Sequence, residues 1–168
     1  SPSFVPGARR MAVYEELRRR GVRIRVLTNS LASNDAPAAH AGYARYRGDL
    51  LALGVELYEM RSDPETAAEL LGSGAGRKQD HPGWWGSGAG GSKSATDSRA
   101  SLHSKAVIID QRLSVIGSMN LDLRSQLKNS EVGLVVRSAP FAQQATRQLE
   151  ATLATAAYRL ERRDHHFY

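Results

Sequence analysis

The apolar run at residues 106–109 (AVII) directly follows two polar residues, His103 and Lys105, and no other pattern constrains the fold as much. Side chains two residues apart in a β-strand point to the same face, so His103 and Lys105 should project side by side. Asp110 ends the run, and a second strand is expected over residues 113–117. Because successive residues of the run are apolar, we expect a central strand that is covered on both faces.

Further polar residues follow the second strand. Ser118 and Asn120 are two residues apart, so their side chains should point to the same face of an extended segment. Glu131 lies at the start of the next apolar run, residues 130–136. Phosphoryl chemistry uses a nucleophilic imidazole, a fixed cation and small hydroxyl or amide donors. Together with the histidine and lysine before the first strand, these residue types predict a site that acts on phosphate.

Helix and strand patterns alternate along the N-terminal part of the chain. Helical spacing covers residues 8–20 and 38–53, and a glycine follows each stretch as a stop signal. Strand patterns cover residues 22–28 and 55–60. A final helix is expected over residues 141–158, before a charged tail that we expect to be loose. This alternation predicts an α/β fold with right-handed crossovers.

Residues 61–101 form a long Gly- and Ser-rich loop inside the domain. Its two GSGAG repeats lack the strand–loop–helix context and the following Lys-Ser/Thr of a phosphate-binding loop. Trp84 and Trp85 within the loop either dock on a membrane or partner, or pack against the same molecule.

Composition narrows the classes of function. The chain has no cysteine, which excludes disulfides, thiolate metal sites and a cysteine nucleophile. No apolar run approaches the roughly 18 residues that a membrane helix needs. The net charge of +6 suits a phosphodiester, a nucleic acid or an anionic lipid surface, and it suits an ordinary basic protein equally well. Arg23 and Arg25 share a strand face, which we expect to be solvated or covered by a helix, not a nucleic-acid stripe.

Several other positions are weaker site candidates. Asn29 and Ser30 follow the first strand, where α/β proteins bind ligands, but a simple capping loop explains them as well. His40 and the terminal His165-His166 pair are candidates too, although such histidines more often only pack or bind nothing. No carboxylate pair or His–carboxylate triad at ligand spacing lies near the motif, so we expect no metal and no cofactor.

The spacing of the polar residues resembles the HKD motif of the phospholipase D superfamily. It begins at His103 and reads His-x-Lys-x4-Asp-x6-Gly-Ser, with the asparagine and the glutamate after it. Over most of the chain, segments such as RGVRIRVLTNSLASND, HAGYARYR and GVELYE resemble the second half of bacterial cardiolipin synthases of the C type. The resemblance implies an α/β phospholipase D-like fold, a mixed β-sheet flanked by helices on both faces. It also implies that residues 1–168 form a single HKD domain, the C-terminal half of a two-HKD protein.

The resemblance and the chemistry of the side chains together suggest roles for the motif. His103 would attack a phosphodiester phosphorus, or protonate the leaving alkoxide if another histidine attacks, since imidazole titrates near neutral pH. Glu131 would accept the other ring N–H and fix the tautomer. Lys105 would neutralise phosphate oxygens, and Ser118 and Asn120 would donate hydrogen bonds to them.

Asp110 is expected to be structural by the same resemblance, bonding backbone near the turn. Asp110 is an odd number of residues from His103 and Lys105, so its side chain should point to the opposite face of the strand, which agrees with this role. The resemblance implies a covalent phosphohistidine intermediate, which an alcohol can resolve in place of water. Transfer and hydrolysis would then share their first step.

The chain contains one HKD motif, whereas members of the superfamily bring two together across a twofold axis. His40 and His81 are not followed by the lysine and the spaced aspartate of a second motif. Either two copies share a site in a homodimer, or the first half is missing from the chain. The start without Met and the match to a second half favour a missing half.

The leading expectation for function is a phosphatidyltransferase of phospholipid metabolism, similar to cardiolipin synthase, that acts through a phosphohistidine. It would contact an anionic membrane peripherally, on the cytoplasmic side of the bacterial inner membrane. The alternatives are a homodimeric single-HKD phosphodiesterase or nuclease and a catalytically incomplete pairing domain. Basic charge would help a nuclease to hold DNA, but the sequence shows no stripe of basic and aromatic residues for that purpose.

Overall fold

The computed structural model describes residues 1, 4–33, 37–62, 102–121, 130–163 and 166–167. The expectations for the loop from residue 63 onward, including Trp84 and Trp85, lie outside these residues. Those for His81 and for the His165-His166 side chains also lie outside them.

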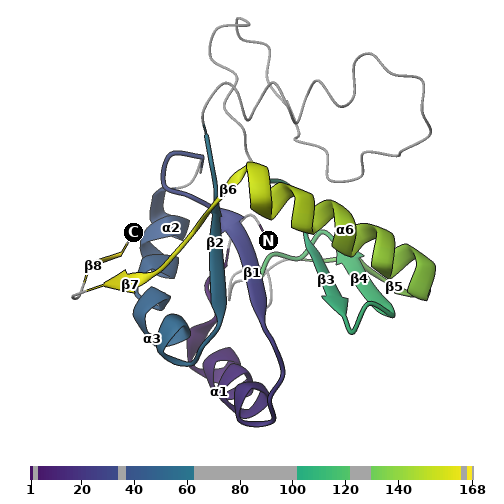
Figure 1. The fold of residues 1–168 in the computed structure, drawn as a ribbon, viewed down its shortest axis with the longest axis horizontal. Helices are drawn as coiled ribbons and strands as arrows, with labels where there is room; N and C mark the ends of the chain where they lie inside the picture. The colour runs from purple at the N-terminus through teal and green to yellow at the C-terminus, as the bar shows by residue number, and fades with distance from the viewer. Residues whose placement is uncertain (2–3, 34–36, 63–101, 122–129, 164–165, 168) are drawn as a thin grey trace, which may run out of the picture.

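The first half of the chain alternates helix and strand, as its periodicity predicts (Figure 1). The elements in chain order are α1 Gly7–Arg19, β1 Arg25–Asn29, α2 Pro37–Ala44, α3 Arg47–Ala52 and β2 Glu56–Met60. The single helix predicted over 38–53 is divided in two, because the backbone tightens where the Tyr46 N–H donates to the Tyr43 carbonyl oxygen. The first strand starts later than predicted, because the Val22 N–H closes α1 by donating to the Leu17 carbonyl oxygen.

The second half begins with three strands and continues into a long helix. Its elements are β3 Ala106–Ile109, β4 Leu113–Gly117, β5 Gly133–Arg137, α6 Ala139–Thr155, β6 Ala157–Arg159, β7 Arg162–Arg163 and β8 His166–Phe167. Ser138 caps α6, since its hydroxyl oxygen accepts from the Phe141 N–H. Neither α6 nor any other described helix is long and apolar enough to cross a membrane. The prediction of a loose tail is wrong in part, because Leu160 is buried and β7 pairs with β8.

Two three-stranded sheets form the framework. β1 pairs in parallel with β2, and β6 adds antiparallel to β2, whereas β3, β4 and β5 form an antiparallel meander. The α/β class is therefore confirmed, but the expected mixed sheet is divided, because no strand of one sheet is hydrogen-bonded to the other within the described residues. Helix α6 lies across both sheets and contacts β6, β3 and β4 (Figure 1).

Each face of the β1–β2–β6 sheet has its own hydrophobic core. On one face, strand β2 packs against α2, α3 and the N-terminal segment. The buried members of this first cluster are Phe4, Tyr43, Leu50, Val55, Leu57 and Leu160. On the other face, α6 packs through Leu149 and Leu153. The buried members of this second cluster are Leu27, Met60, Leu102 and Ala156. Helices thus cover both faces of this sheet, and Leu102 anchors the chain just before the polar pair.

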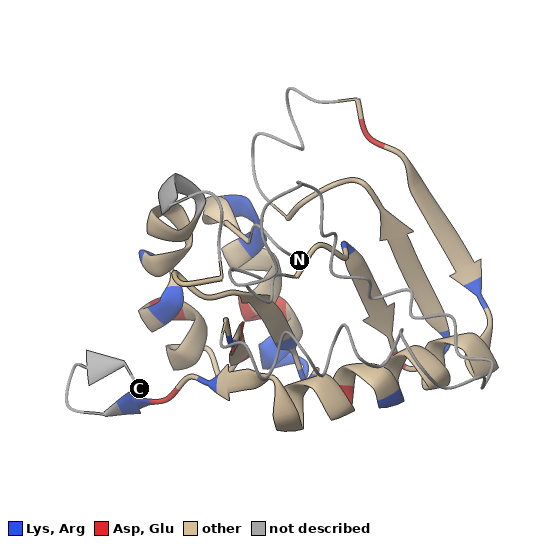
Figure 2. Ribbon diagram, turned by 90° about the horizontal axis from the view of Figure 1, so that it is seen from above, with Lys and Arg blue, Asp and Glu red and all other residues tan. Residues whose placement is uncertain are grey.

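One face of the β3–β4–β5 sheet is open. The strand register places Val107, Val115 and Val135 side by side on this face, where Val107 is 39% and Val135 is 55% exposed. Ser114, on the opposite face, is fully buried, and α6 contacts β3 and β4. The prediction that β3 is a central strand covered on both faces is therefore wrong, because one face of β3 is open and, within the described residues, β3 pairs with β4 alone. Figure 2 shows that these strands carry charge only at the end of β5.

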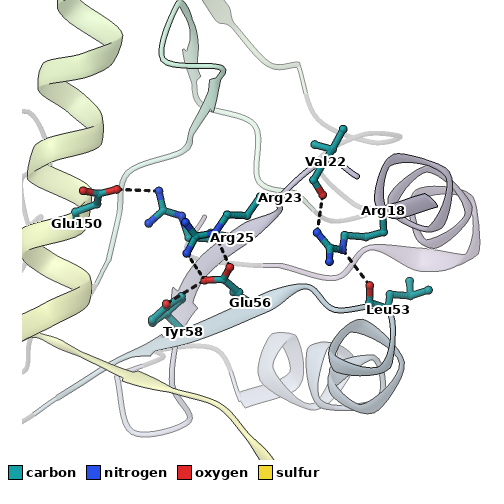
Figure 3. Close-up of polar contacts among 8 residues, drawn as sticks. All are labelled: Arg18, Val22, Arg23, Arg25, Leu53, Glu56, Tyr58 and Glu150. Atoms are coloured by element: carbon teal, nitrogen blue, oxygen red, sulfur yellow. Dashed lines mark hydrogen bonds and ion pairs between the residues drawn. The ribbon is translucent and has the colours of Figure 1, made fainter. Parts of the chain in front are cut away.

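Ion pairs join β1 to its neighbours (Figure 3). The Arg23 guanidinium, just before β1, donates to the two carboxylate oxygens of Glu56 at 2.6 and 3.0 Å. The Tyr58 hydroxyl donates to the same carboxylate at 3.3 Å, and Arg25 pairs with Glu150 of α6 at 3.0 Å. Partly exposed pairs of this kind contribute only about 0–1 kcal/mol each. Both arginines are therefore ion-paired, and the partner of Arg25 is a residue of helix α6.

Gly117 lies where β4 comes closest to the start of β5. A Cβ atom added at Gly117 would lie 2.3 Å from the Val132 carbonyl oxygen, whereas one added at Gly133 would meet nothing within 4 Å. We therefore expect Gly117→Ala to lower the free energy of unfolding by roughly 1–3 kcal/mol, because the backbone must move. Gly133→Ala should change it by less than about 0.5 kcal/mol. Urea denaturation measures both values, and equal losses in the two variants would contradict the close approach.

Candidate active site

His103 and Lys105 lie together just before β3. The Lys105 ammonium is 3.5 Å from His103 Nε2 and donates to the His103 carbonyl oxygen at 3.0 Å. His103 is exposed, and Lys105 is partly buried. Burial lowers the pKa of Lys105, and the nearby Glu131 carboxylate acts in the opposite direction. The pair therefore presents an imidazole and an ammonium to the same space, a combination suited to a phosphodiester.

Two backbone anchors hold this pair. Leu102, directly before His103, is buried, and its N–H and C=O are both bonded by the side-chain amide of Asn29, at 2.8 and 3.1 Å. The Lys105 carbonyl oxygen accepts from the Gly117 N–H at 3.1 Å. The first anchor ties the segment to β1, and the second ties it to β4.

Three of the weaker candidates from the sequence, Asn29, Ser30 and His40, are internal residues. Asn29 and Ser30 are 4% and 8% exposed, so they do not form an open pocket rim. The Ser30 hydroxyl shares a hydrogen bond with the Ser33 hydroxyl at 3.0 Å, as a local loop would have. His40 is buried beside Arg47, with 2.9 Å between their nitrogens, and burial and the Arg47 cation both lower the pKa of His40. No three His, Asp or Glu side chains gather as metal ligands in the described residues.

Glu131 lies just before β5 and has Ser118 as a partner. The Ser118 hydroxyl donates to the Glu131 carboxylate and accepts from the Val132 N–H at 3.0 Å. The Ser118 N–H in turn donates to the Val132 carbonyl oxygen at 2.9 Å. Ser118 therefore fastens the chain before β5 to the end of β4 and orients the carboxylate. The predicted bond between Glu131 and the His103 ring, and the predicted contact of Ser118 with phosphate, stay predictions.

A pocket of about 210 Å³ adjoins the open face of the β3–β4–β5 sheet. Lys105 and Glu131 contribute charged groups to its lining, and Val107, Val115 and Val132 contribute apolar walls. Apolar walls with a few charged groups are the usual composition of a ligand pocket. The apolar half of this lining was missed from the sequence, because the strand was expected to be covered on both faces.

Asp110 lies at the other end of β3 from His103, in the turn to β4. Its backbone is left-handed, with φ 49°, and Gln111 follows with φ 53°. The Arg112 N–H closes the turn on the Ile109 carbonyl oxygen at 3.0 Å. Aspartate tolerates this conformation better than most residues other than glycine. The position suits a structural role through the turn conformation, whereas the expected bond from the carboxylate to backbone is not found within the described residues.

Asn120 follows β4 at the point where the N-terminal segment joins the second sheet. The neighbouring residue, Leu121, forms a parallel bridge with Phe4, and its carbonyl oxygen accepts from the Val5 N–H at 2.9 Å. The Asn120 side-chain oxygen is buried and has no hydrogen-bond partner among the described residues. Its contact with phosphate stays a prediction.

Comparison with known proteins relates this site to a family. Residues 87–153 match the family described as "Cardiolipin synthase, PLD-like domain". Cardiolipin synthase C of Escherichia coli (strain K12) is 38% identical over 160 residues, which are 95% of this chain and 30% of that protein. The chain contains a phospholipase D-like domain. The resemblance drawn from the HKD motif is thereby confirmed.

Two further similarities concern part of this phospholipase D-like domain and its fold. Cardiolipin synthase A of Buchnera aphidicola subsp. Acyrthosiphon pisum (strain Tuc7) is 50% identical over 40 residues, 24% of this chain and 8% of that protein. The crystal structure of Nuc from Salmonella typhimurium, a phospholipase D family member, matches with a TM-score of 0.57 at 16% identity. That match covers 94% of this chain and 76% of Nuc, and it confirms the predicted fold. The chain spans only 30% of the length of cardiolipin synthase C.

The link between Glu131 and Lys105 predicts how activity depends on pH. Glu131→Gln removes the charge that raises the pKa of Lys105, so that pKa falls further below the usual lysine value. We expect the Lys105 cation to bind the phosphate, so the loss of activity at alkaline pH should begin at a lower pH in Glu131→Gln than in the wild type. The pH profile of kcat/KM for hydrolysis of bis(4-nitrophenyl) phosphate measures this shift.

The matched control is Glu15→Gln, which neutralises an exposed carboxylate on α1. It should leave unchanged the alkaline limb of the profile, that is, the pH range over which kcat/KM falls at alkaline pH. If Glu131 also orients the His103 ring, Glu131→Gln lowers kcat more than it raises KM. An alkaline limb that stays fixed or moves to higher pH would show that Glu131 does not act on Lys105.

Proposed function

We propose that this phospholipase D-like domain transfers a phosphatidyl group from a phospholipid to an alcohol, as in cardiolipin synthesis. The observation that carries the proposal is the pocket in which Lys105 and Glu131 adjoin a wall of valines, with His103 next to the lysine. A phospholipid has the matching combination of an anionic phosphodiester and apolar chains. The names of the similar cardiolipin synthases point to the same substrate class.

The reaction would take two steps at His103. A ring nitrogen attacks phosphorus, a phosphorus–nitrogen bond forms, and the bond from phosphorus to the headgroup oxygen breaks as that oxygen takes a proton from a second histidine. An alcohol oxygen then attacks the phosphohistidine, its proton returns to the second histidine, and the phosphorus–nitrogen bond breaks. Lys105 neutralises the charge that develops on the non-bridging oxygens in both steps.

The second histidine is expected from a second HKD half. This half would belong to the same longer polypeptide or to a second copy of the chain, arranged about a twofold axis. The net charge of +6 would favour peripheral contact with an anionic membrane, at the cytoplasmic face of the bacterial inner membrane. Such contact brings the site to its lipid substrate.

A phosphodiesterase that cleaves nucleic acid is the second candidate, and the positive net charge favours it. Two observations weigh against it. Arg23 and Arg25 are paired with carboxylates, and the pocket beside Lys105 has valine walls where a polar nucleotide would be poorly matched.

A catalytically incomplete pairing domain is the third candidate, and it would retain the twofold contact without turnover.

Labelled phosphatidylglycerol in vesicles tests the proposal, because its headgroup hydroxyls let one lipid serve as donor and acceptor. We expect the wild-type protein to form a diphosphatidyl product that thin-layer chromatography separates. His103→Ala should lower the rate of formation at least about 10³-fold, since the nucleophile is lost. Because His103 is exposed, the variant should keep the denaturation midpoint of the wild type.

Nicking of supercoiled plasmid by the same preparations is the counter-test. Nicking that His103→Ala abolishes, without any lipid product, would favour the nuclease. Failure of both assays in a preparation that contains both HKD halves, or rates that His103→Ala leaves unchanged, would leave the pairing domain.

A further inference from the structure

The side chain of Asn29 bonds both backbone polar groups of Leu102. Its amide nitrogen donates to the Leu102 carbonyl oxygen at 3.1 Å, and its amide oxygen accepts from the Leu102 N–H at 2.8 Å. Both residues are almost fully buried, with exposed fractions of 4% and 6%. A carboxamide has the same donor and acceptor as a peptide group, so Asn29 pairs with Leu102 as a neighbouring strand would.

The position of this pair makes it relevant to the site. Asn29 is the last residue of β1, and Leu102 is the residue directly before His103, although 73 positions separate the two in the sequence. The other anchor of the segment is the Gly117 N–H on the Lys105 carbonyl oxygen. The His103 backbone is therefore held between a contact to the first sheet and a contact to the second.

Few side chains other than asparagine could make this contact at the same length. Aspartate keeps an acceptor for the Leu102 N–H, but it sets a second oxygen against the Leu102 carbonyl oxygen. Leucine has a similar size and leaves both buried backbone groups without a partner, which proteins rarely tolerate. Both replacements should let the chain before His103 shift relative to β1.

We propose that Asn29 is a positioning residue, which acts through Leu102 to set where the His103 ring stands relative to the phosphate. The inference rests on the proposed phosphoryl chemistry at His103. Asn29 is buried and touches the backbone, not the substrate, so its loss should slow the chemical step without weakening substrate binding. A displacement of about 1 Å in a reacting group can lower a rate about 100-fold.

The test compares Asn29→Leu and Asn29→Asp with Thr146→Val in the full protein. Thr146→Val also removes a buried hydrogen bond, from Oγ1 to the Ala142 carbonyl oxygen at 2.8 Å, but within α6. We expect both Asn29 variants to lower kcat at least tenfold, with KM changed less than twofold, on vesicles of phosphatidylglycerol and on bis(4-nitrophenyl) phosphate. Thr146→Val should keep kcat within twofold of the wild type.

Hydrogen exchange gives a readout that does not depend on activity. The Leu102 amide should exchange at least tenfold faster in Asn29→Leu than in the wild type, while the amides of the β1–β2 ladder keep their rates. General loss of stability would instead speed exchange in the ladder as well, as it would in Thr146→Val.

Each outcome bears on the proposal. A kcat within twofold of the wild type in Asn29→Leu, or an effect confined to KM, would overturn it. If the wild type cleaves bis(4-nitrophenyl) phosphate but forms no lipid product, the proposed transfer fails, and the kcat of the Asn29 variants on that ester still decides the positioning role. If neither substrate is turned over, the proposed chemistry fails, and the positioning role that rests on it fails too; an unchanged Leu102 exchange rate overturns the positioning role in every case.

Discussion

The burial of Leu102 connects the chemistry of this domain to its folding. Its side chain belongs to the cluster between the β1–β2–β6 sheet and α6, so the hydrophobic free energy that forms this core also fixes the residue before His103. Burying a leucine side chain contributes about 1.5–3 kcal/mol, more than an exposed ion pair such as Arg23 with Glu56. The location of His103 thus depends on packing before it depends on charge.

The candidate site lies at the junction of the two sheets. Helix α6 lies across both, and the segment from Leu102 to Lys105 is bonded to β1 at one end and to β4 at the other. Glu131 reaches the same pocket as Lys105 from the chain before β5, where Ser118 holds it. Residues from distant parts of the sequence therefore meet at one place because two small sheets share one helix.

Much of this arrangement could be predicted from local sequence. The spacing of His103 and Lys105, the order of helices and strands, and the α/β class follow from periodicity and parity, which are local properties. The division of the sheet and the addition of β6 could not be predicted. Ala157–Arg159 is too short to show alternation, and its pairing with β2 is a long-range contact. The contact of Asn29 with Leu102 could not be predicted either, because 73 positions separate the two residues in the sequence. The sequence did single out Asn29 as a candidate at the end of its strand.

The meander of β3, β4 and β5 has a consequence for how the domain behaves at high concentration. In the described part of the chain, β5 is an outer strand, and its Leu134 and Val135 are 63% and 55% exposed. An outer strand presents unpaired backbone groups to any other chain that approaches in extended form. Arg137, at the end of β5, supplies one charge against such association, so self-association through this edge is an aggregation hazard of the described part of the fold.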